Sequence, residues 1–433
     1  MSKTRNVPEA VKLESLIQWG LLIILAIMPF HAFLSVWLGS LTHHQAIIQA
    51  WKEALLIALT AATVVLVWSD PKRLKILRAP WVMAAAAFAV IALIVTTFTL
   101  PPPTAIAFGL KTDLEFLLAG LLALIVATPI FARRVIFTVL AAASLAVGID
   151  LALIFLLPSD FLTHFGYGPQ TILPYQHIAA GTTALRFPGT LGGPNQLGTY
   201  LILPLCLSLI LALKYRRHRL WVLFAGSIVG LIATQSRAAW LGALLAVAFA
   251  AFVVLAPRLQ RRFAIISALL GVAALLALPL VISSGGSLQY FLLHSSVATH
   301  DEAGLSDAQH TKSLEQGAAA TLQQPLGHGL GTAGPATFHA GNGNIIEDYY
   351  LQIGFEAGIL GLLAFISALG LLTRTLLARH GAHHPLAVAA AGAIVGICLV
   401  SLVLPAWADS STALIVWISA GAAAGLRPGA SYV

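Results

Sequence analysis

Long apolar runs are the feature that most restricts what this chain can fold into. A membrane-spanning helix needs about 20 mostly apolar residues, and the sequence holds twelve runs of about that length. The candidate spans are residues 16–38, 48–68, 80–100, 106–128, 135–157, 195–213, 220–234, 238–256, 263–282, 346–373, 384–404 and 411–426. Only 9% of the 433 residues are charged, whereas soluble proteins carry about 25%. The sequence therefore predicts an all-α polytopic membrane protein with about twelve transmembrane helices.

The lysines and arginines predict how these spans are oriented. Cytoplasmic loops of membrane proteins collect positive charge. With the N-terminus inside, 19 of the 24 lysines and arginines fall in segments on the inner side. The five that remain are Lys52, Lys111, Arg186, Arg237 and Lys312. The net charge of +8 therefore reflects membrane topology and does not indicate nucleic-acid binding.

Two long connections, 158–194 and 283–345, both fall on the outer side. Connections longer than about 12–15 residues are usually functional or disordered, and these two contain the Pro, Gly and aromatic residues of a folded cap. We therefore expect three parts. Residues 1–282 hold spans one to nine with outer loop 158–194, residues 283–345 form a large outer loop or cap between spans nine and ten, and residues 346–433 hold spans ten to twelve. The outer face is the expected working face.

Two arginines on the outer side are candidates for binding an anion. Arg186 precedes a Pro-Gly turn that leads to Asn195, and Arg237 follows Gln235 in a tight turn between two spans. A guanidinium is permanently charged and can hold phosphate through two parallel hydrogen bonds. The alternative is that each arginine contacts lipid phosphate at the headgroup level. Two such residues in a chain that keeps positive charge inside favour a paired clamp on a diphosphate, with Asn195 and Gln235 as supporting groups.

The outer segment before span ten contains the candidate general base. This segment opens with glycines and then places His339 upstream of Glu347 and Asp348. Histidine is the natural general base at neutral pH, although a loop histidine can also serve only as a hydrogen-bonding group. Glu347 and Asp348 can orient His339, bind a sugar hydroxyl or a cation, or cap span ten, where negative charge is favourable. For Asp348 we expect the cap.

Ionisable groups are also expected inside the bundle. Lys111, Asp113 and Glu115 in span four are predicted to form a mutually neutralising buried set, and Glu356 is predicted to face the bundle or a cavity. The sequence has neither a Walker A loop nor the His/Cys spacing of a metal site. Nothing in it requires a nucleotide, a metal or another cofactor.

Short ordered blocks between residues 160 and 365 resemble those of a known family. Pro325 to Gly331 (PLGHGLG), followed by Tyr350 to Gly361 (YLQIGFEAGILG), is similar to the signature of the O-antigen ligase and O-antigen polymerase superfamily. Arg186 to Asn195 and Thr234 to Gly242 resemble two further blocks of that family, each with its arginine.

One departure from the family pattern concerns the residues before Tyr350. Many members carry His-Asn before the Tyr-Leu pair, and Glu347 and Asp348 occupy those positions here. The nearest histidine is His339, upstream in the loop. This arrangement favours the ligases over the polymerases.

The resemblance implies a GT-C-like membrane glycosyltransferase of the Gram-negative inner membrane, with its site on the periplasmic side. A ligase of this kind takes O-antigen from undecaprenyl diphosphate and transfers it to a sugar hydroxyl of lipid A–core, without a metal and with inversion. Its partners are these two substrates and the membrane lipids. Arg186 and Arg237 would hold the diphosphate, His339 would accept the proton of the attacking hydroxyl, and Tyr350 would support the site.

Three other functions are consistent with parts of the sequence. An O-antigen polymerase uses the same chemistry with a second lipid-linked glycan as the acceptor. A lipid or polysaccharide transporter would have charged or broken helices at mid-membrane and pseudo-symmetric halves, and the sequence shows neither clearly. A non-catalytic envelope scaffold would leave the outer arginines and His339 unexplained.

Overall fold

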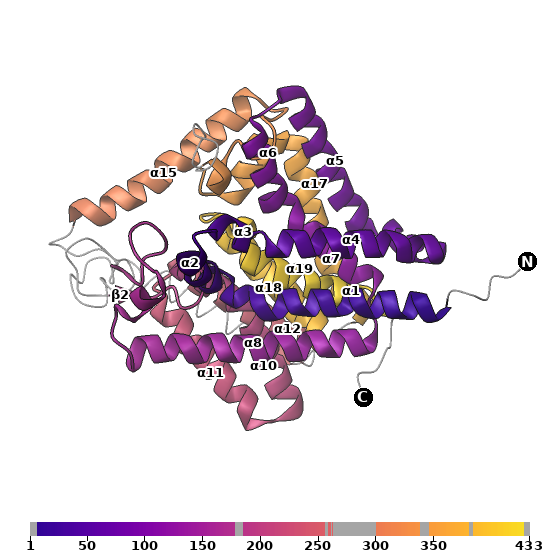
Figure 1. Ribbon diagram of the computed structural model, residues 1–433, viewed down its shortest axis with the longest axis horizontal. Helices are drawn as coiled ribbons and strands as arrows, with labels where there is room; N and C mark the ends of the chain where they lie inside the picture. Colours follow the sequence, from indigo (N-terminus) through magenta and orange to yellow (C-terminus); the bar gives the residue numbers. More distant parts are fainter. Residues whose placement is uncertain are drawn as a thin grey trace, which may run out of the picture.

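The computed structural model describes residues 7–177, 185–255, 259–260, 262, 300–337, 346–380 and 384–427. Most of its helices are labelled in Figure 1. In the element names used here, η denotes a 3-10 helix, except for η3, which is a π-helix. The first part of the chain forms α1 (Val7–Ile27), η1 (Met28–Phe30), α2 (His31–Thr42), α3 (Gln45–Gln49), α4 (Trp51–Ser69), η2 (Pro71–Arg78), α5 (Pro80–Thr99), α6 (Pro103–Gly109), η3 (Leu110–Leu114), α7 (Glu115–Ile125) and α8 (Pro129–Phe155).

In the rest of the described chain the regular elements are helices and two very short strands. Its elements are η4 (Phe161–Phe165), β1 (Gln176–His177), β2 (Leu185–Arg186), α9 (Pro194–Tyr200), α10 (Ile202–Tyr215), α11 (His218–Ala233), α12 (Arg237–Val254), α15 (His300–Gln323), η5 (Gly334–Ala336), α17 (Tyr349–His380), α18 (Pro385–Val400), η7 (Ala406–Ala408) and α19 (Ser410–Ala424). The strands pair antiparallel, with Gln176 opposite Arg186. The predicted all-α class is confirmed.

Most of the predicted spans coincide with helices. Among the described residues, seven helices are long and apolar enough to cross a membrane, and α11, α18 and α19 are shorter apolar helices. Predicted span four corresponds to α6, η3 and α7 in succession. Predicted span nine, at 263–282, lies outside the described residues. A multi-pass membrane protein is therefore supported, while the count of twelve, the three-part division and the GT-C-like assignment remain predictions.

The two C-terminal helices form the centre of the bundle. Residues 411–424 of α19 are all buried, and most of α18 is buried as well. Figure 1 shows both helices, in yellow, among α1, α7 and α12. Small residues allow close helix packing in membranes. A Cβ atom on Gly421 would lie 2.1 Å from the carbonyl oxygen of Gly120, so α19 and α7 touch through their backbones.

Two membrane helices in the described part of the chain are interrupted, which the sequence did not show clearly. Gly358 interrupts α17 with φ 72° and ψ 177°. The π-helix η3 interrupts span four at 110–114. Single-turn π segments inside helices often occur at functional sites. Both irregularities contribute to the polar regions described below.

Two hydrogen bonds join segments that are predicted to be on the same side of the membrane. At the predicted inner end, Gln18 donates to the carbonyl of Val126 at 2.8 Å. At the predicted outer end, the hydroxyl of Thr190 donates to the carbonyl of Pro29 at 2.6 Å. In Figure 1, α15 runs along the edge of the molecule away from both termini. The alternation of the loops, and which end faces the periplasm, remain predictions.

Candidate functional site

Arg186 lies at the end of β2 and is held by two neutral acceptors. Its Nε donates to the backbone carbonyl of Thr234 at 2.9 Å, and its Nη2 donates to Oδ1 of Asn195 at 2.9 Å. These contacts use two of the five N–H donors that a guanidinium carries. Arg186 forms no ion pair with a carboxylate among the described residues. Its side chain is therefore oriented by the fold while its charge is not neutralised there.

The turn between α11 and α12 places the second arginine near the first. Gln235 has a left-handed backbone with φ 52°, and Arg237 is the first residue of α12. Burial lowers the pKa of Arg186, and the positive charge of Arg237 lowers that pKa further. Because Arg186 donates to the carbonyl of Thr234, three residues before Arg237, its guanidinium lies against the turn that carries the second positive charge. The structure thus brings together Arg186, Asn195 and the turn that carries Gln235 and Arg237.

A polar cavity of about 470 Å³ lies at the predicted outer end, and neither arginine lines it. Side chains from α2, α4, the outer loop and the connection before α19 line it. Its polar lining consists of His31, Ser35, Gln45, Gln49, Lys52, Lys111, Gln170, Thr171, Gln196, Asp409, Ser410 and Ser411. Gln196 follows Asn195 in α9, so the cavity and the Arg186 site adjoin through one helical turn. A pocket of this volume can accommodate a sugar-sized ligand.

One end of this cavity is built from ion pairs that the sequence did not reveal. Lys52 is fully buried, and its Nζ lies 2.8 Å from Glu115 Oε2 and 2.7 Å from Glu53 Oε1. Lys111 Nζ lies 3.1 Å from the same Glu53 oxygen. The position of Lys52 on the outer side, where positive charge is disfavoured, was the available signal.

The predicted set of Lys111, Asp113 and Glu115 is therefore wrong in its membership. Asp113 lies apart from the lysines and accepts hydrogen bonds from the Tyr349 hydroxyl at 3.1 Å and from Gln352 Nε2 at 3.3 Å. Residues two apart on a helix point to different sides. Asp113 consequently connects span four to α17, whereas Lys111 and Glu115 connect span four to α4.

The glycine-rich segment before α17 fills the break in that helix. The backbone N–H of His328 donates to the carbonyl of Phe355 at 2.8 Å, and that of Gly329 donates to the carbonyl of Glu356 at 2.9 Å. Those two carbonyls cannot form regular helical bonds because Gly358 leaves the helical conformation. The imidazole of His328 also stacks on Phe355, with ring centroids 3.8 Å apart.

The side chain of Glu356 adds a further contact between α17 and the glycine-rich segment. Its side chain is fully buried, as expected, and its Oε1 accepts a hydrogen bond from the N–H of Ala333 at 3.0 Å. A buried carboxylate needs such donors. The fold therefore fixes the backbone leading into the loop that contains His339.

The polar residues at the start of α17 have different environments. Asp348 accepts a hydrogen bond from the N–H of Leu351 at 2.8 Å and so caps α17, as expected from its position. Glu347 is half-buried beside α15, where its N–H donates to the Ser313 hydroxyl at 3.3 Å. The Tyr350 hydroxyl donates to the carbonyl of Cys398 at 2.9 Å and links α17 to α18. The predicted base, His339, lies outside the described residues.

These features define a multi-pass membrane protein with a cationic, polar site at one end of its helix bundle. Residues 222–366 match the family described as O-antigen ligase. The matched segment contains the Arg237 turn and both glycine-containing blocks, whereas Arg186 precedes it. The match confirms the resemblance to the superfamily of O-antigen ligases and polymerases, whose members are glycosyltransferase-like enzymes acting on lipid-linked glycans. No curated protein matches the chain.

Proposed function

We propose that this protein is an O-antigen ligase of the bacterial inner membrane. It would transfer a glycan from undecaprenyl diphosphate to a sugar hydroxyl of lipid A–core on the periplasmic face. The observation that carries the proposal is the contact of Arg186, whose charge no described carboxylate neutralises, with the turn that carries Arg237. A lipid diphosphate has the charge to bind between two such arginines.

The geometry of Arg186 suits a diphosphate leaving group. Thr234 and Asn195 hold one side of the guanidinium, which leaves its other donors for phosphate oxygens. An anion between Arg186 and Arg237 would relieve the repulsion of the two charges and satisfy a half-buried cation. The same contacts would strengthen as negative charge develops on the departing diphosphate, which is the condition for lowering the barrier.

The reaction is a single displacement. The acceptor oxygen forms a bond to the anomeric carbon as the bond from that carbon to the diphosphate oxygen breaks. The electron pair of the broken bond leaves with the diphosphate, and His339 takes the acceptor's proton. Attack from the face opposite the leaving group inverts the anomeric configuration. We assign no part of this reaction to a metal or a nucleotide.

Purified protein in liposomes tests this proposal directly. With undecaprenyl-diphosphate-linked glycan, lipid A–core, a chelator and no nucleotide, we expect glycosylated lipid A–core with inverted linkage. Extension of the lipid-linked glycan itself, with lipid A–core untouched, would identify a polymerase instead. Absence of any covalent product from either acceptor would overturn the glycosyltransferase assignment.

One observation favours a transporter, namely the broken helix α17. Broken helices in transporters expose carbonyl groups that bind ions. Here the carbonyls of Phe355 and Glu356 accept hydrogen bonds from the chain itself. The break therefore serves to attach the glycine-rich segment, which supports the enzyme. Movement of glycolipid across the liposome membrane without a covalent product would favour the transporter.

A further inference from the structure

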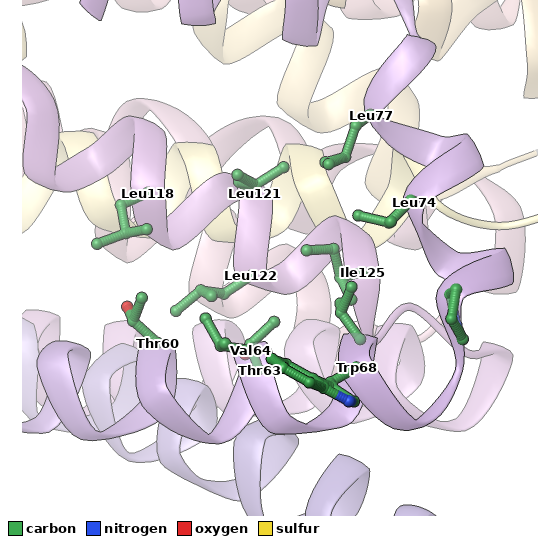
Figure 2. A pocket seen from close by; sticks show the side chains of 12 residues that line it. Thr60, Thr63, Val64, Trp68, Leu74, Leu77, Leu118, Leu121, Leu122 and Ile125 are labelled. Atoms are coloured by element: carbon green, nitrogen blue, oxygen red, sulfur yellow. The ribbon is translucent and has the colours of Figure 1, made fainter.

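A second cavity lies at the opposite end of the molecule from the arginines. It is a groove of about 550 Å³ between α4 and α7, closed at one end by η2. Figure 2 shows Val64 and Trp68 on one side of it, facing Leu118, Leu122 and Ile125 on the other. The lining is almost entirely hydrocarbon, with Thr60 and Thr63 among the few polar residues.

The helix η2 places positive charge at the mouth of this groove. Leu74 and Leu77 of η2 line the groove, as Figure 2 shows. Lys72, Lys75 and Arg78 on the same helix are exposed. None of these three forms an ion pair with a described residue. The apolar groove thus ends at a group of exposed basic residues, Lys72, Lys75 and Arg78, which we call the basic collar.

A fourth basic residue fixes the collar in place. Arg73 forms ion pairs with Glu14 and with Asp70, the latter at 3.3 Å, and its Nη1 donates to the carbonyl of Ile125 at 3.1 Å. These contacts attach η2 to α1 and α7. The acidic groups nearby are therefore engaged by Arg73, and Lys72 and Lys75 remain available to an outside anion.

The aromatic residue at the groove indicates its depth in a bilayer. Trp68 is 84% exposed and lies in the last turn of α4, next to η2. Tryptophan is enriched at the level of lipid headgroups. The groove runs from that level along α4 toward the middle of the membrane, which is the course of an acyl chain.

We propose that this groove binds one anionic glycerophospholipid of the surrounding leaflet, with an acyl chain between α4 and α7 and its phosphate against Lys72 and Lys75. Basic pockets between transmembrane helices recognise anionic headgroups in this manner. The proposal does not depend on the function proposed above, because the groove shares no lining residue with the polar cavity.

Native mass spectrometry with an equimolar mixture of phosphatidylglycerol and phosphatidylcholine of identical acyl chains tests the site. Each basic residue near an anionic lipid contributes a roughly fivefold preference. Wild-type protein should therefore favour phosphatidylglycerol, and Lys72→Gln/Lys75→Gln should reduce that preference about 30-fold. Arg217→Gln/Arg219→Gln removes two exposed charges at the start of α11, also on the predicted inner side, and should leave the preference unchanged.

A second pair of variants tests the groove itself. Val64→Trp fills the groove and should reduce binding of both lipids, whereas Val90→Trp, on a similarly exposed face of α5, should not. Equal binding of the two lipids to wild type would overturn the proposal, as would a preference that survives Lys72→Gln/Lys75→Gln. Both lysines are exposed, so their replacement tests the headgroup contact even if Val64→Trp fails to fold.

Discussion

The backbone N–H of Gly329 donates a hydrogen bond to the carbonyl of Glu356 at 2.9 Å, and this bond joins the two most recognisable blocks of the sequence. In the same region the N–H of Ile359 donates to the carbonyl of Pro325 at 2.9 Å. An unsatisfied backbone group inside a membrane costs several kcal/mol. The glycine-rich segment and the broken helix therefore depend on each other.

The first prediction concerns Gly358, where this dependence is greatest. A Cβ atom there would lie 2.5 Å from the carbonyl oxygen of Pro325, and the backbone has φ 72°. With ψ 177° this conformation is essentially restricted to glycine, and another residue there costs about 1–3 kcal/mol before any clash. We expect Gly358→Ala to lower the unfolding temperature in detergent by several degrees.

Gly370 provides the matched control in the same helix. A Cβ atom at Gly370 would meet no other atom within 4 Å, so Gly370→Ala should leave the unfolding temperature unchanged or raise it slightly. Equal effects of the two substitutions would show that the break in α17 is not under steric control.

Much of the fold could be predicted from the sequence because lipid imposes one simple requirement. Helices must be long and apolar to cross a bilayer, and α4 and α5 begin and end near the predicted bounds, whereas α8 begins six residues before its predicted span. The break at Gly358 could not be predicted in this way, since a glycine in an apolar run is compatible with a continuous helix. Its position depends on the distant segment that fills it.

Individual residues of the candidate site could be predicted from the sequence, but the contacts between them could not. Arg186 and Arg237 stood out because positive charge is disfavoured on the outer side. The contact of Arg186 with the Thr234 carbonyl spans 48 positions, and the pair Lys52–Glu115 spans 63. Such pairs follow from the order in which helices pack, which local patterns do not contain.

The second prediction concerns membrane topology. With Cys206 and Cys398 replaced by serine, cysteines placed beside Arg186, Arg237 and His339, or at the exposed outer-loop position Leu173, should react with an impermeant maleimide in intact cells. Tyr215, the last residue of α10, is about as exposed as Leu173 and lies on the predicted inner side. Tyr215→Cys should therefore react only after the inner membrane is opened. The reverse pattern at any of the outer positions would disprove the orientation.

The third prediction concerns the two arginines. Arg186→Ala and Arg237→Ala should each reduce transfer by at least about 10²-fold, the usual effect of losing one donor to a developing anion. Lysine replacements should restore activity only in part, because an ammonium lacks the planar fork. Protein levels in the membrane should stay normal, and Arg219→Ala at the other end should be fully active. Full activity of both outer alanine variants would exclude the diphosphate clamp.

The fourth prediction uses Asn195 to separate charge from orientation. Asn195→Asp would put a carboxylate 2.9 Å from the Arg186 guanidinium, where the amide oxygen now lies. That carboxylate would compete with the donor's phosphates, so KM for the lipid diphosphate should rise more than in Asn195→Ala, which keeps the positive charge. If Asn195→Ala proves the weaker binder, Asn195 contributes through the orientation of Arg186 and the charge argument fails.

The last prediction concerns His339, which follows the segment held by Glu356 and precedes α17 in the sequence. A general base contributes typically about 10²–10⁴-fold, so His339→Ala should lower kcat by that amount while binding of the lipid diphosphate survives through the arginines. His339→Gln should be no better, since an amide does not accept the proton. The wild-type rate should fall toward acidic pH as the imidazole becomes protonated, and this acid limb should be absent in both variants. The measurement is kcat against pH, with donor affinity determined separately. Near-normal turnover of His339→Gln, or loss of donor binding in His339→Ala, would assign the base to Glu347 or Asp348, which occupy the His-Asn positions of the family pattern.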